Sequence, residues 1–153
     1  MARALAAELD LAYLAKDEVK EALMDALGAP ADVEESRRLG RAAVHALLRM
    51  ARGCDGAVLD STWFDYTRPL LAELSGPLVE VRCVAPLAVV RARYAARERD
   101  PRHLDRLRSV GELWASDVAP LGVGPLVEVD TSAPVDVPAL ARRLGRVGPV
   151  NRR

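Results

Sequence analysis

Residues 56–71 read GAVLDSTWFDYTRPLL, and this stretch decides the fold class. A short apolar run of strand length ends in the acid Asp60, and a polar turn then leads into a run with helical spacing. Residues 77–100 and 124–146 repeat the order of a strand followed by a helix. Strands that alternate with helices form parallel sheets with right-handed crossovers and helices on both faces. The sequence therefore predicts an α/β fold.

The period of the apolar residues predicts the remaining elements. We expect helices over residues 2–9, 17–28, 31–53, 65–76, 86–100, 101–115 and 135–146. We expect strands over residues 11–15, 56–60, 77–84 and 124–132. Asp17 is placed to cap its helix and Gly28 to end it. Since no repeat or long linker divides the chain, residues 1–147 are expected to form one domain, followed by a loose tail over 148–153.

The composition excludes several classes of protein. The chain has 153 residues, half of them hydrophobic, and a formal net charge of zero, which indicates a soluble globular protein rather than a polyelectrolyte. It contains no charged-then-apolar leader and no apolar run near the ~18 residues of a membrane span. Cys54 and Cys83 are isolated thiols without metal-ligand spacing, which is typical of a reducing compartment. We expect a cytoplasmic protein with no membrane partner and no metal cluster.

Candidate functional residues follow the predicted strands, because ligands of open parallel sheets bind outside the carboxyl ends of the strands. These positions are Lys16-Asp17, Asp60-Ser61-Thr62, Ala85-Pro86 and Asp130-Thr131-Ser132. Two acids and several hydroxyls at one edge suit phosphate and magnesium chemistry. The structural alternative is as strong on spacing alone, since Asp17 and Asp60 can cap a helix or a turn and "DTS" is a common loop composition.

A cluster of arginines forms the second candidate site. Arg93 and Arg97 lie four apart on one helical face, and further basic residues continue to residue 108. A basic segment of this kind can clamp phosphates and neutralise charge on a transferring phosphoryl group. The alternative is a solvated, acid-paired face, because Glu98, Asp100 and Asp105 are interleaved with the arginines. His103 lies inside this cluster, whereas nothing marks His45 as a ligand.

Several stretches together resemble a family of small P-loop kinases. They read ARALAAEL, YLAKDEVKEAL, GAVLDSTWFDYTRPLL, VVRARYAARER and VEVDTSAPVD, and the likeness spans residues 1 to about 147. The family includes AAA-family ATP-binding proteins, polynucleotide 5′-kinase, chloramphenicol phosphotransferase, gluconate kinase and zeta-toxin-type enzymes. The resemblance implies a three-layer P-loop NTPase-like fold, with a parallel sheet between helices on both faces.

The resemblance implies roles on the side of the phosphate acceptor. By position, Asp17 resembles the catalytic carboxylate that orients the acceptor hydroxyl, and Lys20 resembles a basic substrate-side residue one turn later. Asp60 resembles the catalytic acid that holds magnesium through water, and Arg68 a substrate- or phosphate-contacting arginine. Trp63 is expected either to pack in the interior or to form a wall of the substrate pocket.

The resemblance also implies roles on the side of ATP and Mg²⁺. Arg93 and Arg97 resemble catalytic, nucleotide-binding arginines of a basic lid over about 91–108, with Arg91 as the alternative. Residues from Thr131 through Ser132 to Pro134 resemble the loop that flanks adenine.

One part of the family pattern is missing from this sequence. In the family, ARALAAEL follows a strand and a glycine-rich loop, G-x-x-x-x-G-K-[ST], whose amides and lysine hold the phosphates. Met1 falls just after that loop, and neither lysine of this chain follows a glycine. The missing strand is a central one, between the strands expected at 56–60 and 77–84. We expect a start codon assigned too late or a shortened form, with two strand edges exposed unless re-pairing or an oligomer covers them.

The leading interpretation is an ATP-dependent phosphotransferase that acts on a hydroxyl of a small molecule or a nucleic-acid end, inactive in this form without its phosphate-binding loop. One alternative is a non-catalytic nucleotide- or protein-binding module on a degenerate kinase scaffold. Another is toxin-like action on a sugar nucleotide, as in the zeta-toxin relatives.

Overall fold

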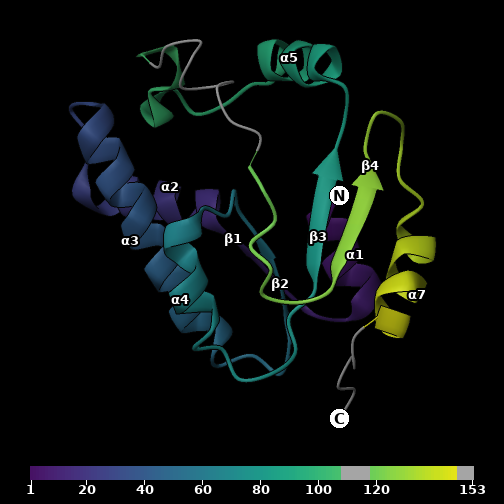
Figure 1. The fold of residues 1–153 in the computed structure, drawn as a ribbon. Helices are drawn as coiled ribbons and strands as arrows, with labels where there is room; N and C mark the ends of the chain where they lie inside the picture. The colour runs from purple at the N-terminus through teal and green to yellow at the C-terminus, as the bar shows by residue number, and fades with distance from the viewer. Residues whose placement is uncertain (108–117, 148–153) are drawn as a thin grey trace.

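The computed structural model describes residues 1–107 and 118–147 of the chain. The helices are α1 (Ala2–Leu9), α2 (Lys16–Leu27), α3 (Val33–Ala51), α4 (Arg68–Leu71), α5 (Leu87–Ala96) and α7 (Val137–Val147). The strands are β1 (Ala12–Ala15), β2 (Ala57–Asp60), β3 (Glu80–Val84) and β4 (Leu126–Asp130). Strands and helices alternate along the chain, as the sequence predicts, and the fold is mixed α/β (Figure 1).

The strands form two parallel pairs. β1 pairs with β2 so that Ala12 lies opposite Ala57 and Ala15 opposite Asp60. β3 pairs with β4 from Glu80 opposite Leu126 to the end of both strands. The prediction of parallel strands is confirmed. In the part of the chain that the structure describes, no strand pairing joins β2 to β3, so the two pairs are separate sheets.

Each sheet has its own hydrophobic core. Figure 1 shows α2, α3 and α4 beside β1 and β2, and α7 beside β4. The first core holds buried side chains from α3, α4 and the loop before β4: Val44, Leu47, Leu48, Leu71 and Leu121. The second holds buried side chains from α1, β4 and α7: Leu5, Val127, Val129, Leu140, Ala141 and Leu144. Burial of these apolar faces is the main force that stabilises each half.

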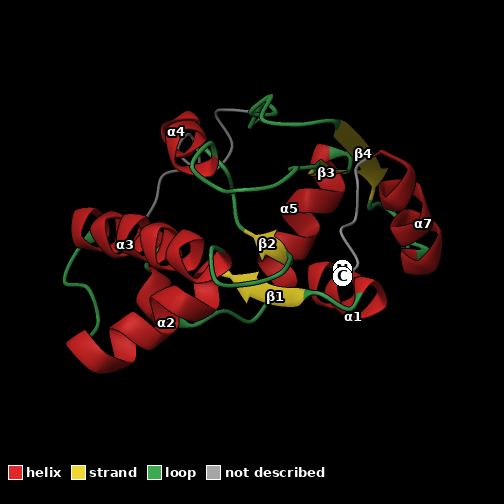
Figure 2. Ribbon diagram, turned by 90° about the horizontal axis from the view of Figure 1, so that it is seen from below, coloured by secondary structure: helices red, strands yellow, loops and turns green. Residues whose placement is uncertain are grey.

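Helix α1 connects the two halves. It contacts β1 and β2 on one side and α7 on the other, as the view from below shows (Figure 2). Leu5 and Ala6 are its buried residues. No side chain caps its first turn, and Asp10 ends it in the left-handed conformation, with φ of 55°. This agrees with the helix predicted over residues 2–9.

The loop before β4 also ties the halves together. The Glu80 carboxylate at the start of β3 accepts hydrogen bonds from the backbone N–H groups of Leu121 and Val123, each at 2.7 Å. Gly124 lies so close to the backbone of Leu78 that a Cβ atom at position 124 would overlap its carbonyl group. The crossing of these two segments therefore requires glycine.

The predicted helix over residues 65–76 is mostly wrong. The structure has a 3-10 turn at Asp65–Thr67, then one turn of α-helix at Arg68–Leu71 with Pro69 in its first turn. The chain then turns, with Leu74 N–H bonded to the Leu71 carbonyl. Gly76, at φ of 126°, adopts a conformation that continues no helix. The apolar spacing in this segment reflects packing on the first core rather than a long helix.

The basic segment differs from its prediction too. Helix α5 ends at Ala96, and residues 101–107 form two 3-10 turns, Pro101–His103 and Asp105–Leu107, instead of a helix from 101. Pro101 disfavours a helical Asp100, and Leu104 breaks the path with φ of 57°. The rest of the helix predicted over 101–115, the end of the 91–108 lid and the tail at 148–153 lie outside the described residues.

Asp17 does not cap its helix. Helix α2 begins at Lys16, and Asp17 lies in its first turn, so its carboxylate is not at the cap position. Gly28 ends the helix as predicted, with φ of 95°. Among the described helices, none combines the length and the apolar composition that crossing a bilayer requires.

Candidate functional site

The structure brings the two predicted carboxylates to one edge of the first sheet. Asp60 is the last residue of β2 and lies opposite Ala15, the last residue of β1. Asp17 follows Ala15 by two residues, in the first turn of α2. Because β1 and β2 run parallel, both acids lie at the carboxyl ends of their strands, where ligands of α/β proteins bind.

Asp60 is positioned by a tyrosine from the neighbouring strand. Its side chain accepts a hydrogen bond from the Tyr13 hydroxyl at 2.9 Å. Tyr13 lies opposite Val58 in the register, two residues before Asp60, so the two side chains share a face of the sheet. Burial, and then the hydrogen bond to Asp60, raise the pKa of Tyr13 to about 12. Tyr13 therefore stays protonated and keeps donating to Asp60.

Asp17 is held by two cations. Lys16 Nζ donates to Oδ1 at 2.6 Å, and Arg99 Nη2 donates to Oδ2 at 2.7 Å. Burial raises the pKa of the Asp17 carboxyl, but the Lys16 hydrogen bond and the positive charges around it outweigh burial and hold the pKa below 3.8. The Asp17 carboxylate is therefore ionised at neutral pH and fixed in orientation by contacts to both oxygens.

Lys20, one turn further along α2, lies in the interior. Its side chain is 2% exposed, and its Nζ donates to Ser36 Oγ at 2.7 Å. Ser36 Oγ in turn donates to the backbone carbonyl of His103 at 3.3 Å. The predicted substrate-side lysine thus lies beneath the segment that contains His103, close to Asp17 but covered.

Residues 97–107, which we call the covering segment, lie against α2 and α3 at the upper left of Figure 1. Arg97 and Arg99 both bond the Asp105 carboxylate, at 3.1 and 2.7 Å. Arg102 bonds Asp100 and reaches Asp25 on α2 at 2.7 Å. The hydrogen bonds from Arg102 lower the pKa of Asp100 to about 2. Acid pairing, the alternative to a phosphate clamp, is therefore found for Arg97, Arg99 and Arg102, and the pairing attaches the segment to α2.

Three of the residues predicted for the nucleotide side, Arg93, Thr131 and Ser132, lie together at the end of the second sheet. Thr131 follows β4, and both its backbone N–H and its hydroxyl donate to the Val84 carbonyl, at 2.8 and 3.0 Å. Asp130 accepts the Ser132 backbone N–H at 2.8 Å, which makes the turn that the structural alternative predicts. Arg93 of α5 donates to the Ser132 carbonyl at 3.2 Å. Arg93 and Ser132 are therefore neighbours.

The other predicted residues are more scattered. Trp63 is partly buried and packs on the first core. Arg68 is exposed and bonds Asp65 at 3.3 Å. Arg97 lies over the Tyr94 ring, with its guanidinium 4.4 Å from the ring centroid, while Pro134 is exposed. These contacts leave the predicted roles of the four residues untested.

The start of α1 lies near the same edge, between the two sheets. Burial, and then the Asp60 carboxylate, raise the pKa of the Cys83 thiol, whereas the amino group of Met1 lowers it. Electrostatic influence of this kind requires proximity, so the Asp60 carboxylate and the amino group of Met1, the residue before α1, both lie near Cys83. Among the described residues, there is no group of three or more histidine, cysteine, aspartate or glutamate side chains that could hold a metal ion.

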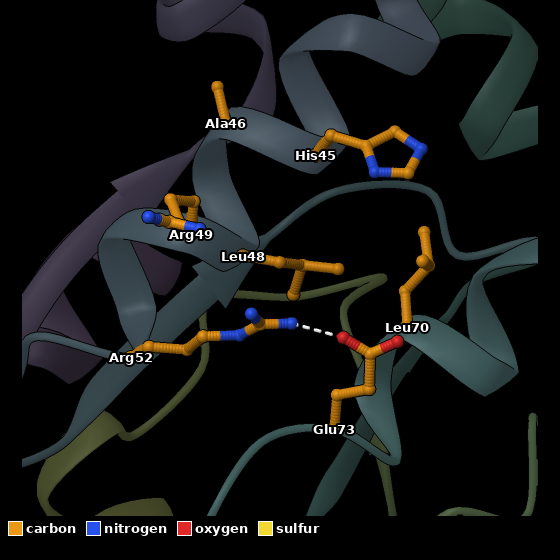
Figure 3. A pocket seen from close by; sticks show the side chains of 7 residues that line it. All are labelled: His45, Ala46, Leu48, Arg49, Arg52, Leu70 and Glu73. Atoms are coloured by element: carbon orange, nitrogen blue, oxygen red, sulfur yellow. Dashed lines mark hydrogen bonds and ion pairs between the residues drawn. The ribbon is translucent and has the colours of Figure 1, made fainter.

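A shallow groove lies elsewhere, near the end of α3 that leads into β2. Its lining residues come from α3, Arg52 and the α4 region: His45, Ala46, Leu48, Arg49, Arg52, Leu70 and Glu73 (Figure 3). Arg52 and Glu73 form an ion pair across it. None of the predicted site residues lines this groove, so the carboxyl edge of the strands remains the candidate site.

Comparisons with known proteins support a kinase-like fold. No protein-family model matches the sequence. No curated protein matches it either. The structure is similar to the crystal structure of a candidate kinase from Chloroflexus aurantiacus, with a TM-score of 0.70 and 29% sequence identity. The match covers 95% of this chain and 89% of the other, so the likeness extends over both sheets.

Sequence reasoning missed the partners of the two acids. Tyr13 was recoverable, because the strand register places it on the same face as Asp60. Arg99 and Glu21 were not recoverable from spacing, since they meet Asp17 and His103 across 82 residues of sequence. The position of His103 inside an arginine cluster was a signal, but it did not indicate burial against α2.

Proposed function

We propose that this chain is the main part of an ATP-dependent phosphotransferase with the three-layer P-loop kinase arrangement. Its acceptor is a hydroxyl of a small molecule or of a nucleic-acid end. The observation that carries the proposal is the likeness to the Chloroflexus candidate kinase over 95% of the chain, at 29% identity. The gathering of Asp17 and Asp60 at one carboxyl edge supports the same chemistry.

Asp17 acts on the acceptor in this proposal. A new bond forms between the acceptor oxygen and the γ-phosphorus, the bond from that phosphorus to the β–γ bridging oxygen breaks, and ADP leaves. The hydroxyl proton passes to Asp17, which the low pKa makes a hydrogen-bond acceptor and orienter rather than a strong base. Mg²⁺ would supply charge neutralisation at the phosphates, with Asp60 holding one of its water ligands.

The nucleotide side is completed by the basic residues of α5 and by the turn after β4. Arg93, which donates to the Ser132 carbonyl, is placed to reach a phosphate near that turn. Arg97 lies at the end of the same helix and is the second lid arginine of the proposal, while Thr131, Ser132 and Pro134 flank the adenine. Arg68 and Trp63 belong to the acceptor pocket, and Lys20 supports it from beneath the covering segment.

In this proposal, another segment supplies the phosphate anchor. The chain contains no glycine-rich loop with a following lysine, so its own residues do not fit the phosphates of ATP on their own. We place the missing strand and loop between β2 and β3, ahead of α1. Two observations support this position: the sheets are separate, and the apolar residues of β2 and β3 are only partly buried.

The test is phosphoryl transfer from γ-labelled ATP by the chain extended with the codons that precede Met1. We expect label on a hydroxyl acceptor, loss of transfer in Asp17→Asn, and no transfer by residues 1–153 alone. The proposal would be contradicted if the extended chain transferred no label to sugars, to small alcohols or to nucleic-acid ends. A stop codon close before Met1, with no glycine-rich loop encoded, would remove the position given to the anchor.

A second candidate is a non-catalytic binding module on the same scaffold. The observation that favours it is the state of the acceptor side, where cations bond both oxygens of Asp17 and Lys20 is covered. Calorimetric titration of the extended chain with ATP–Mg²⁺ separates the two candidates. Tight binding favours the enzyme, and no binding favours the module.

A further inference from the structure

His103 is a buried histidine whose contacts fix its tautomer. It lies in the 3-10 turn Pro101–His103 and is 2% exposed. One ring nitrogen, Nε2, lies 2.9 Å from Glu21 Oε1, and the other, Nδ1, lies 3.1 Å from Arg99 Nη2. A guanidinium only donates hydrogen bonds, so Nδ1 must be the acceptor. The ring proton is therefore on Nε2, which donates to Glu21, and the imidazole is neutral.

Arg99 links this histidine to Asp17. The same Nη2 atom that donates to His103 Nδ1 also donates to Asp17 Oδ2, at 2.7 Å. Its two hydrogens are thus committed to the imidazole and to the carboxylate. The other terminal nitrogen, Nη1, donates to Asp105 at 2.7 Å. The guanidinium is held on three sides, and His103 is the one neutral partner among them.

The backbone at His103 is held as firmly as its ring. Ser36 on α3 donates to its carbonyl, and Lys20 on α2 donates to the same hydroxyl. Arg102, the neighbouring residue, is bonded to Asp25 on α2. Two helices therefore fix the position of the imidazole, and a fixed imidazole can fix Arg99.

We propose that His103 is a positioning residue for phosphoryl transfer, whose neutral imidazole holds the Arg99 guanidinium on the Asp17 carboxylate. This inference rests on the proposed function of Asp17. With Lys16 on Oδ1 and Arg99 on Oδ2, the carboxylate plane cannot rotate, while each oxygen retains a further lone pair for an acceptor hydroxyl. Fixed orientation of a reacting group is worth large factors in rate.

Burial, more than the surrounding charges, favours this neutral state. From α2, Glu21, Asp17 and Lys20 face it, and Arg99 faces it from its own segment, while α3 contributes the uncharged Ser36. Burial lowers the pKa of His103, the Glu21 hydrogen bond raises it, and the Arg99 charge lowers it again, with a net result below 6.5. Protonation would turn Nδ1 into a donor facing a guanidinium, and Arg99 would lose that contact.

Two substitutions separate positioning from simple packing. His103→Asn keeps an acceptor oxygen near the place of Nδ1, so the contact to Arg99 survives. His103→Gln keeps a donor near the place of Nε2, so the contact to Glu21 survives, and it removes the acceptor for Arg99. His45→Asn is the matched control, because His45 is exposed on α3 and lies far from the covering segment in sequence.

The readout that needs no activity is the titration of the Asp17 carboxyl carbon by NMR. We expect the Asp17 midpoint to rise in His103→Gln and to stay at the wild-type value in His103→Asn and His45→Asn. In the transfer assay of the extended chain, we expect kcat to fall about 10-fold in His103→Gln with KM for ATP unchanged, and to recover in His103→Asn. An unchanged Asp17 midpoint in His103→Gln, or equal loss of kcat in both variants, overturns the inference.

The wild-type protein gives a test that does not depend on the variants folding. Nitrogen NMR of the two imidazoles, assigned with His45→Asn, should show His103 protonated on Nε2 alone at neutral pH. Protonation on Nδ1 would overturn the inference, because that tautomer cannot accept from Arg99. Since tautomer and Asp17 titration are read without ATP, failure of phosphoryl transfer with these results intact would count against the proposed function only.

Discussion

The two halves of the molecule are held together in different ways. The half built on β3 and β4 is held to its helices by apolar contact, with Val127 and Val129 of β4 packed on α7 and α1. The half built on β1 and β2 also has an apolar core, and in addition a polar network that attaches residues 97–107 to α2 and α3. The candidate acceptor side is organised by these specific hydrogen bonds, whereas the candidate nucleotide side relies on a few backbone contacts.

The two halves also differ in how completely their strands bury apolar side chains. Apolar residues of β2 and β3, such as Leu59 and Val81, are only partly buried, although runs of this kind are typical of central parallel strands. Residues of β4 alternate between buried and exposed, as expected of a strand with one covered face. Among the described strands, β4 is therefore the one with a fully covered face, while β2 and β3 keep apolar residues that are only partly buried.

The largest expected effect comes from opening the first core. Leu47→Ala should lower the free energy of unfolding by about 2–5 kcal/mol, because Leu47 is 0% exposed and the cavity would have no solvent to fill it. Leu144→Ala is the matched variant in the second core, where the side chain is 7% exposed, and should cost less. Urea denaturation of both variants measures the difference. A larger loss in Leu144→Ala would contradict the ranking of the two cores.

The second largest effect is expected where residues 78 and 124 cross between the halves. Gly124→Ala should cost about 1–3 kcal/mol, since the added Cβ meets the Leu78 carbonyl and one of the two backbones has to move. Gly145→Ala is the control, because nothing lies within 4 Å of a Cβ at that helical position. Thermal denaturation of the pair should show loss in the first variant and a small gain in the second. Equal stability of the two would show that the segments do not cross as described.

Acid should weaken the polar network before it affects the apolar half. The folded protein holds His103 neutral at pH values where the unfolded chain is protonated, so unfolding takes up a proton and stability falls as the pH drops below 6.5. The lowered pKa of Asp17 adds a further loss below 3.8. The midpoint of urea denaturation, measured from about pH 7 down to about pH 5, gives the loss of stability that comes from His103. His103→Asn should flatten that part of the curve, and a stability that rises toward pH 5 would contradict the assignment.

The smallest effect concerns the hydroxyl beside Asp60. Tyr13 should ionise at about 12, and Asp60→Asn should lower that value because the carboxylate charge no longer opposes a phenolate. Ultraviolet absorbance follows the ionisation of the three tyrosines of the chain, and Tyr13→Phe identifies the component that belongs to Tyr13. If Asp60→Asn leaves that component in place, the contact to Asp60 is not what raises the pKa of Tyr13.

Much of the fold was predictable from the sequence, and the reasons are local. Strands such as GAVLD and LVEVD carry apolar runs closed by an acid, and each precedes a helix, so their parallel pairing follows from general rules. Helix lengths after Arg68 and Pro101 were not predictable from apolar spacing, because the spacing does not encode the turn after Leu71 or the positive φ of Leu104.

The candidate site was predictable only in outline. The strand ends indicate Asp17 and Asp60, since position along a parallel strand fixes the edge at which a residue lies. The burial of Lys20 and the contact of Arg99 with Asp17 depend on how residues 97–107 fold back over α2, which no spacing in the sequence encodes. Long-range polar contacts of this kind need the tertiary structure.

The most direct test of the account is amide hydrogen exchange at the two facing strands. In residues 1–153 we expect fast exchange at those amides of β2 and β3 that do not bond to β1 or β4. We expect slower exchange in α3 and α7, which line the two cores. If the proposed strand exists, a chain extended by the codons that precede Met1 should exchange more slowly in both Ala57–Asp60 and Glu80–Val84. Exchange that is already slow there in residues 1–153, or that the added segment leaves unchanged, would contradict a sheet that takes one further strand at its centre.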